Sequence, residues 1–220
     1  TRGPYVTATP QPTAVPTRRT PTMRHSPVPT DATGNAEFYL EMPPMPPGFG
    51  SPPDSFTLSS GAFAAGGEIP IEYTCHGDNV SPALSWSGVP ADAQSLVLVM
   101  TDPDATPAEF VHWLVYNIPA DSAVLEPFQP NEATLSDGAL QGLNAYSAAH
   151  HPTAPSGEPI CTVGYAGPCP PSAHRYVLRL YALDTTLPLE PGATSAQVAA
   201  AMRSHVLALA ELEGRFSPPS

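Results

Sequence analysis

Four polar side chains between residues 102 and 176 stand where predicted β-strands begin or end. They comprise a carboxylate, two imidazoles and a phenol: Asp102, His112, His174 and Tyr176. A nearby carboxylate favours the protonated form of an imidazole, and imidazolium, phenol and loop amide groups are hydrogen-bond donors for a phosphate or carboxylate. If the fold brings these strand ends together, the residue types predict a pocket that holds a small anion.

Three apolar runs must position these side chains, and each is bounded by turn-forming residues. They are residues 95–101 (SLVLVMT), 111–118 (VHWLVYNI) and 175–183 (RYVLRLYAL). Shorter β-type segments are predicted at residues 56–58, 69–73 and 84–86. Short strands between Gly- and Pro-rich turns favour an antiparallel sandwich over alternating βαβ units.

A hairpin of the first two runs would place the carboxylate and the first imidazole at the same edge of the sheet. Side chains alternate between the two faces of a strand, so His112, Leu114 and Tyr116 are expected to share one face. His174 and Tyr176 are two residues apart near the start of the third run, and they are likewise expected to share a face. Three neighbouring strand ends could therefore supply all four groups of the pocket.

One helix is predicted near the C-terminus. Thr194 and Gln197 fit a capping box, in which each residue satisfies a free amide of the other. An apolar stripe at spacings of four and three follows, formed by Val198, Met202, Val206 and Leu209. Gly214 is expected to end this helix. Together with the strands, the helix predicts a mainly β fold, an antiparallel β-sandwich with peripheral helices.

Composition divides the chain near Ser55. Of its 31 prolines, 13 precede this residue, in a threonine-rich stretch with no apolar periodicity. Such a stretch favours extended, polyproline-like conformations. Two segments are therefore predicted: an extended Pro/Thr-rich arm, residues 1–54, and a folded domain, residues 55–220. The arm is electrically neutral, so the domain carries the whole net charge of −12.

This charge excludes some partners and favours others. An acidic domain without a single lysine repels nucleic acid and anionic lipid surfaces. No apolar run is long enough to span a membrane. The arm resembles the stalks of exported proteins, so an extracytoplasmic location (periplasmic, cell-surface or secreted) is expected. A protein partner that binds the arm is also expected, because a proline-rich strand can lie along a partner surface at low entropic cost.

Four motifs in order along the chain, CHGDNVSPALSWSGVP, TDPDATP, VHWLVYNIP and GYAGPCPPSAHRYVLRLYALD, resemble the phosphatidylethanolamine-binding protein family. The resemblance spans about residues 56–216 and is strongest to the bacterial, Raf kinase inhibitor-like branch. It implies a β-rich fold of antiparallel sheets with a pocket for phosphate-like anions. By motif, it implies that the pocket is formed by Asp102, Asp104, His112, Gly167, Pro168, His174 and Tyr176, with Asp104 supporting its base and the Gly-Pro pair forming one lip.

Two departures from the family pattern lie near this pocket. Thr106 stands where the family motif DPDAP has its proline, which is expected to reshape one wall. Residues 146–162 lengthen the link that precedes the GYAG motif. Since this link lies next in sequence to the pocket lip, it could cover or narrow the mouth.

The longer link also bears on cross-links and metals. Adjacent histidines such as His150 and His151 rarely bind one ion together, and no Cys/His spacing fits a zinc pattern, so no metal site is predicted. Three cysteines permit at most one intrachain disulfide. The expected pair is Cys161–Cys169, which would pin the link to the lip, and Cys75 is the alternative partner of Cys169.

Function is expected to be binding rather than catalysis. The chain has no GxSxG elbow, no HExxH helix and no phosphate-cradling glycine loop followed by lysine. The leading hypothesis is a non-catalytic domain for a small anion, such as a phospholipid head group, without a cofactor, which inhibits or modulates another protein. The alternative is a structural or accessory subunit that the arm docks into a larger assembly.

Overall fold

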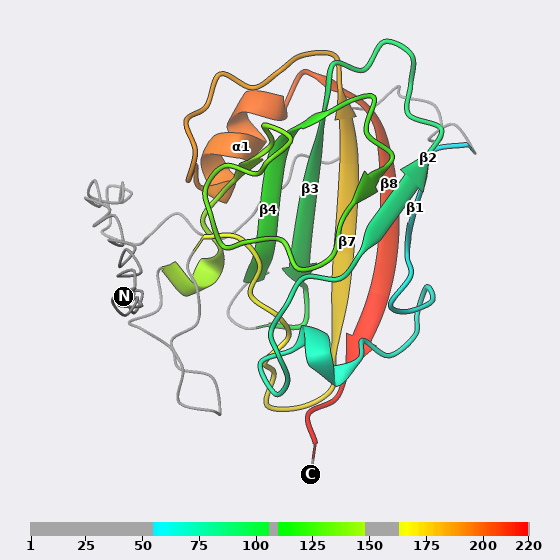
Figure 1. Cartoon of the computed structure of the whole chain (residues 1–220), viewed down its shortest axis with the longest axis vertical. Helices are drawn as coiled ribbons and strands as arrows, with labels where there is room; N and C mark the ends of the chain where they lie inside the picture. Colours follow the sequence, from blue (N-terminus) through cyan, green and yellow to red (C-terminus); the bar gives the residue numbers. More distant parts are fainter. Residues whose placement is uncertain (1–54, 106–109, 148–162, 220) are drawn as a thin grey trace, which may run out of the picture.

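The computed structural model describes residues 55–105, 110–147 and 163–219. The predicted arm, Thr106 and residues 148–162, with the paired histidines and Cys161, lie outside the described residues. The described residues form two antiparallel sheets and one α-helix (Figure 1), so the predicted β-sandwich is confirmed. No helix among them is long and apolar enough to cross a membrane.

The larger sheet has five strands in the order β6-β4-β3-β7-β8. They are β6 (Leu140–Gln141), β4 (Phe110–Pro119), β3 (Ser95–Asp102), β7 (His174–Leu183) and β8 (Val206–Phe216). The smaller sheet has the order β1-β2-β5: β1 (Thr57–Ser60), β2 (Leu84–Ser87) and β5 (Val124–Leu125). Because β3 pairs antiparallel with both β4 and β7, its end lies beside the starts of both neighbours.

Strand β3 is buried along its whole length, since both faces of the larger sheet are covered. On one face, Leu98 and Met100 pack with Leu84 and Trp86 of the smaller sheet and form the core of the sandwich. A central strand covered on both sides needs apolar residues at every position. This is why residues 96–100 form a continuous apolar run rather than an alternating pattern.

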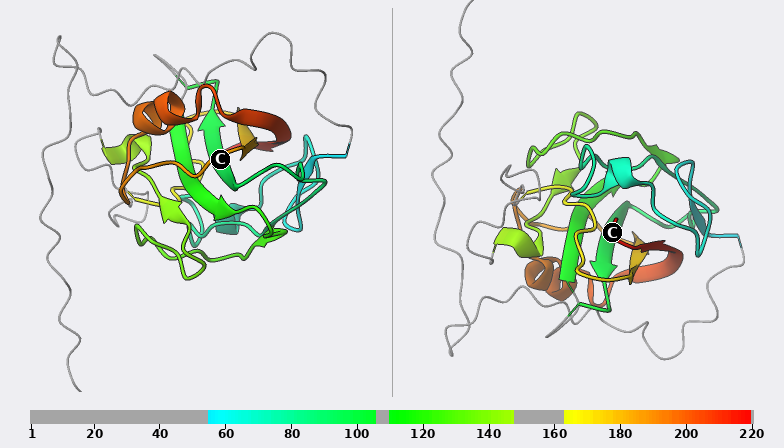
Figure 2. Two further views of the ribbon diagram at one scale, coloured as in Figure 1. Left: turned by 90° about the horizontal axis from the view of Figure 1, so that it is seen from above. Right: turned by 90° about the horizontal axis from the view of Figure 1, so that it is seen from below.

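The opposite face of the larger sheet is covered by helix α1 (Ser195–Met202). Val97 and Val99 of β3 pack there with Val198 and Met202 of the helix. The views from above and below in Figure 2 show the helix on one side of this sheet and the smaller sheet on the other. The larger sheet is therefore a rigid middle layer, and its strand ends are held on both sides.

The C-terminal segment agrees with the sequence prediction only as far as Met202. The capping box is present, with the Thr194 hydroxyl accepting from the Gln197 amide and the Gln197 side chain accepting from the Thr194 amide. The helix ends at Met202 and does not extend to Gly214. Residues 206–216 form β8 instead, with buried and more exposed side chains in strict alternation. The sequence prediction missed this period of two because the apolar residues at 198, 202, 206 and 209 also have the spacing of a helix.

The predicted strand at residues 69–73 is also wrong. The amide of Ile69 donates to the Arg215 carbonyl (2.7 Å), so the chain briefly runs beside β8. Pro70 follows, with φ −59°, and it has no N–H to continue a ladder. The next three residues form a short 3₁₀ helix, η1 (Ile71–Tyr73).

Candidate functional site

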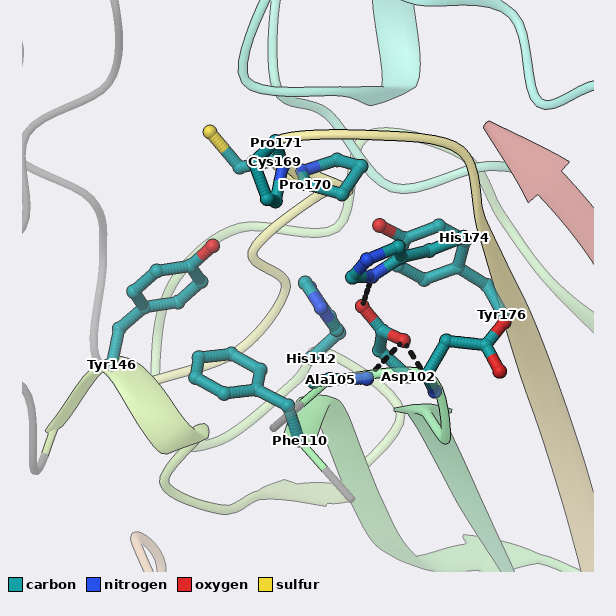
Figure 3. A pocket seen from close by; sticks show the side chains of 11 residues that line it. Asp102, Ala105, Phe110, His112, Tyr146, Cys169, Pro170, Pro171, His174 and Tyr176 are labelled. Atoms are coloured by element: carbon teal, nitrogen blue, oxygen red, sulfur yellow. Dashed lines mark hydrogen bonds and ion pairs between the residues drawn. The ribbon is translucent and has the colours of Figure 1, made fainter. Parts of the chain in front are cut away.

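The ends of β3, β4 and β7 meet at one end of the larger sheet, the lower end in Figure 1. Asp102 is the last residue of β3, His174 is the first of β7, and His112 and Tyr176 are the third residues of β4 and β7. All four side chains line one pocket of about 450 Å³, which Figure 3 shows from close by. Asp104 lines the same pocket.

His112 lies at a shift in the pairing between β3 and β4. Met100 pairs with Trp113 but Thr101 pairs with Val111, so the register skips His112. A bulge of this kind interrupts simple alternation. The expected shared face of His112 with the two apolar residues further along β4 is therefore broken. Its ring instead contacts the ring of Tyr176 edge-on, with the centroids 5.2 Å apart.

The Asp102 carboxylate organises the floor of the pocket. One oxygen, Oδ1, accepts hydrogen bonds from the backbone amides of Asp104 (2.9 Å) and Ala105 (3.0 Å). The other, Oδ2, lies 2.7 Å from Nδ1 of His174. Since the carboxylate is an acceptor on both sides, His174 donates from Nδ1 and is left with Nε2 for a ligand. Asp102 is only 4 % exposed, so water does not compete for these bonds.

His112 is fixed in the opposite wall by a backbone carbonyl. Its Nδ1 donates to the carbonyl of Ala166 (2.6 Å), which leaves Nε2 as the nitrogen that can meet a ligand. Burial lowers the pKa of His112 below its usual value, and the Ala166 carbonyl and the Asp102 charge only partly offset this effect. At neutral pH, His112 is therefore neutral. The sequence suggested imidazolium groups because of the nearby carboxylate. It could not show that His112 is buried, and burial disfavours the charged form.

Tyr176 has a buried hydroxyl without a hydrogen-bond partner among the described residues. Burial raises the pKa of this phenol, and the charge and the acceptor oxygens of nearby Asp102 raise it further. Even so, no acceptor of the described residues meets the hydroxyl in ordinary hydrogen-bond geometry. A buried polar group left unpaired costs about 1–3 kcal/mol. Such a group in a pocket wall has its hydrogen-bonding capacity available to a molecule that enters the pocket.

Two further aromatic residues complete the wall, and the sequence analysis did not select them. Phe110 lies between His112 and Tyr146, with ring centroids 4.9 Å and 4.7 Å from theirs. Burial, with the Asp102 charge adding to it, raises the pKa of Tyr146 to about 12, so its hydroxyl stays a donor. Phe110 is the first residue of β4, two residues before His112, and this position at the strand end could have indicated a place in the pocket wall. Tyr146 was visible only as the first residue of the longer link.

Asp104 supports the pocket from its rim through a pair with Arg175. Its carboxylate accepts from the Arg175 guanidinium (2.7 Å and 3.1 Å) and from the Arg175 backbone amide (2.9 Å). These hydrogen bonds hold the pKa of Asp104 at about 2, so the group stays ionised at any physiological pH. The pair ties the turn after β3 to the start of β7, and it thereby fixes the spacing of Asp102 and His174.

The lip of the pocket is formed by Cys169, Pro170 and Pro171. Cys169 forms a disulfide with Cys75, with the two Cα atoms 5.4 Å apart. The expected Cys161–Cys169 pairing is therefore wrong, and the alternative partner is the correct one. No local spacing could reveal this pair, because the two cysteines are 94 residues apart and meet only in the folded chain.

Gly167 and Pro168 lie behind this lip and are not among the residues that line the pocket. The Gly167 amide donates to Oδ1 of Asn79 (2.8 Å), and the Pro168 carbonyl accepts from the Cys75 amide (3.1 Å). A Cβ atom at Gly167 would lie 2.2 Å from the carbonyl oxygen of Tyr73. Glycine is required here because two backbone segments approach each other closely.

The phosphatidylethanolamine-binding protein family model matches residues 59–217, which include the larger sheet, all but the first two residues of the smaller sheet and every described residue of the pocket. The chain belongs to this family. A UPF0098 protein from the archaeon Methanothermobacter thermautotrophicus is 49 % identical over 160 residues, which cover 72 % of this chain and 97 % of that protein. One from Chlamydia muridarum is 40 % identical over 170 residues, covering 72 % and 97 %. Similar proteins thus occur in archaea and bacteria alike, so the likeness is not confined to a bacterial branch.

Two solved structures of family members have the same fold. A phosphatidylethanolamine-binding protein homologue from Chlamydia trachomatis is 38 % identical, with a TM-score of 0.62, and covers 76 % of this chain and 100 % of its own. YbcL from E. coli, described as a member of the mammalian family, is 28 % identical, with a TM-score of 0.64, and covers 75 % and 99 %. Family membership supports a ligand-binding domain.

The buried neutral histidine predicts a loss of stability in mild acid. The folded state disfavours protonated His112, so the unfolded chain binds this proton more readily. The free energy of unfolding should fall as the pH drops below about 6.5, by up to ~1.4 kcal/mol per pH unit. Urea unfolding between about pH 7 and 5.5 measures this slope.

The comparison is with His112→Asn, whose side-chain amide can still donate to Ala166. The slope attributable to His112 should disappear in this variant. His205→Asn is the matched control, since His205 is exposed and pairs with Asp184 at the surface. An identical slope in wild type and His112→Asn would contradict the prediction.

Proposed function

We propose that the pocket binds a small, phosphate-like anion together with a proton, and that it does not convert this ligand chemically. The observation that carries the proposal is the buried Tyr176 hydroxyl, which has no partner among the described residues and stands in the wall beside two imidazoles. A ligand oxygen would supply the missing hydrogen bond. Nε2 of His112 and of His174 would then flank the same ligand.

The proton follows from the charges around the pocket. Asp102 is negative, and His112 is neutral at neutral pH because it is buried. An anion that enters favours the charged form of the buried His112 imidazole and so raises the pKa of His112, and binding takes up a proton. Affinity for an anion should therefore increase as the pH falls. For a cationic ligand the affinity would instead decrease as the pH falls, because protonated imidazoles would repel it.

The described lining residues support binding rather than catalysis. None of them is a serine, a threonine or a free cysteine that His112 could activate, and Cys169 is held in a disulfide. A binding domain of this kind suits a sensor or modulator of another protein. The disulfide supports the expectation of an oxidising, extracytoplasmic compartment. Docking through the arm stays a prediction, because the arm lies outside the described residues.

Calorimetry with phosphoethanolamine and with sulfate, at about pH 5.5 and 8, tests the proposal. Sulfate keeps its charge over this range. A higher affinity for sulfate at the lower pH is therefore due to protonation of the protein and not of the ligand. His174→Ala should remove most of the binding. Undetectable heats with both anions at both pH values would overturn the proposal.

Tyr176→Phe separates a ligand-binding role from a structural one. It should weaken anion binding by about tenfold or more, yet raise the free energy of unfolding by ~1 kcal/mol, because an unpaired hydroxyl is removed. Tyr165→Phe is the matched control. Its buried hydroxyl donates to the Tyr73 carbonyl (2.6 Å), so its loss should destabilise the fold and leave binding unchanged. Equal destabilisation by both variants would contradict this prediction.

A further inference from the structure

Two cysteines and a histidine lie together at the pocket lip. The sulfur atoms of Cys75 and Cys169 and a ring nitrogen of His76 all lie within 4.8 Å of one another. His76 directly follows Cys75, so one turn supplies a sulfur and a nitrogen, and the lip supplies the second sulfur. The group does not depend on the anion proposed for the pocket.

The three donor atoms form a ligand set for a thiophilic divalent cation once the disulfide is reduced. Zn²⁺ binds thiolate sulfur at about 2.3 Å and imidazole nitrogen at about 2.0–2.1 Å in a tetrahedron. These bond lengths put neighbouring donor atoms roughly 3.5–3.8 Å apart. No donor atom now lies more than 4.8 Å from another, and the two bonded sulfurs must move apart to reach this separation once the disulfide is reduced.

The backbone would keep the two cysteines together after the S–S bond is broken. The Cys75 amide donates to the Pro168 carbonyl (3.1 Å), next to Cys169 in the chain. The Gly167 amide donates to the Asn79 side chain (2.8 Å), which ties the same two segments again. A third hydrogen bond, from the His76 amide to the Thr74 hydroxyl (3.2 Å), holds the turn. The site is therefore largely preformed.

A reductant and a cation can approach from the lip side. Cys75 is buried at 3 % exposure, whereas Cys169 and His76 are both partly exposed. Figure 3 shows the sulfur of Cys169 directed away from Asp102 and His174. The opening of the cluster is thus separate from the polar floor of the pocket, and a cation there does not occupy the anion position.

We propose that Cys75, His76 and Cys169 form a binding site for a zinc-like cation when a dithiol reduces the disulfide. The dithiol is oxidised to its own disulfide, and the two cysteines receive its two electrons and two protons. The cation then binds both thiolates and releases these two protons to solvent. Three protein ligands leave the fourth tetrahedral position for water. The lip is thereby cross-linked in both states, by sulfur in one and by metal in the other.

Co²⁺ is the probe, because thiolate ligation gives it a charge-transfer band and tetrahedral geometry gives it strong visible bands. The full chain is used with Cys161→Ser, so that Cys75 and Cys169 are its only cysteines. Reduced protein should develop both sets of bands with one cobalt per chain, and oxidised protein should develop neither. Zn²⁺ should displace the cobalt and raise the melting temperature of the reduced protein only.

His76→Ala tests the third ligand. It should weaken Co²⁺ binding by at least about tenfold, a loss that even an outer-shell partner can cause. His205→Ala, at an exposed histidine elsewhere, should leave the affinity unchanged. The proposal is overturned if reduced protein gives no thiolate band, if oxidised protein gives the same bands, or if His76→Ala binds equally well. Loss of the near-ultraviolet circular dichroism on reduction would also overturn it, since the site requires the fold.

Discussion

Reduction of the Cys75–Cys169 disulfide is expected to lower the free energy of unfolding by about 4–5 kcal/mol in the absence of metal. The two cysteines are 94 residues apart, so the bond closes a loop that spans most of the domain. Releasing this loop increases the conformational freedom of the unfolded chain far more than that of the folded one. The loss is a large share of the 5–15 kcal/mol that stabilises a typical domain.

Urea unfolding of Cys161→Ser protein with and without a dithiol measures this effect. A variant in which Cys75 and Cys169 are both alanine should show the low stability under both conditions, and this insensitivity is the control for other effects of the reductant. A difference of less than about 1 kcal/mol between oxidised and reduced protein would contradict the prediction. Zn²⁺ should recover part of the loss in the reduced protein and none in the double-alanine variant.

Asp102→Ala is expected to lower the free energy of unfolding by about 3–5 kcal/mol and to abolish anion binding. The carboxylate is nearly inaccessible to water and accepts from two backbone amides and from His174. Its removal would leave three partly buried donors without this acceptor. His174 would also lose the group that orients it, so the pocket would lose its arrangement as well as its stability.

Burial, rather than the hydrogen bond alone, should decide the size of this effect. Asp184 provides the matched control, because it pairs with His205 at the same 2.7 Å but both side chains are at least 40 % exposed. Asp184→Ala should change the free energy of unfolding by less than about 1 kcal/mol. Asp102→Asn keeps an acceptor for the two amides. It should therefore lower the free energy of unfolding by less than Asp102→Ala and by more than Asp184→Ala. Chemical denaturation of the three variants and calorimetry with sulfate provide the measurements.

Strands β3, β4 and β7 of the larger sheet could be predicted from local sequence, and β3 and β4 show the clearest signal because they are buried along almost their whole length. Residues 96–100 are apolar at every position, and both faces of β3 are in fact covered. The polar groups that end this strand and begin its neighbours then follow from antiparallel pairing. For the same reason, Asp102 and His174 could be chosen as candidates before their 2.7 Å contact was seen.

The C-terminal segment shows the limit of local pattern. Its capping box correctly predicts where α1 begins, because Thr194 and Gln197 interact within one turn. Where the helix ends depends on β7, since residues 206–216 pair with that strand along its full length. Apolar residues at 198, 202, 206 and 209 fit a helical period, while burial of alternate residues in β8 fits a strand. Only the distant partner decides between the two.

The four residues at the strand ends illustrate both contributions. Their types and positions were determined by the sequence, which placed a carboxylate, two imidazoles and a phenol where three strands meet. Their charge states and partners depended on tertiary structure, because burial lowers the pKa of His112 and places the Tyr176 hydroxyl where none of the described residues pairs with it. The disulfide at the lip likewise joins residues that no local pattern relates. Residue type is a local property, whereas solvent exposure and contact partners arise only when distant segments pack together.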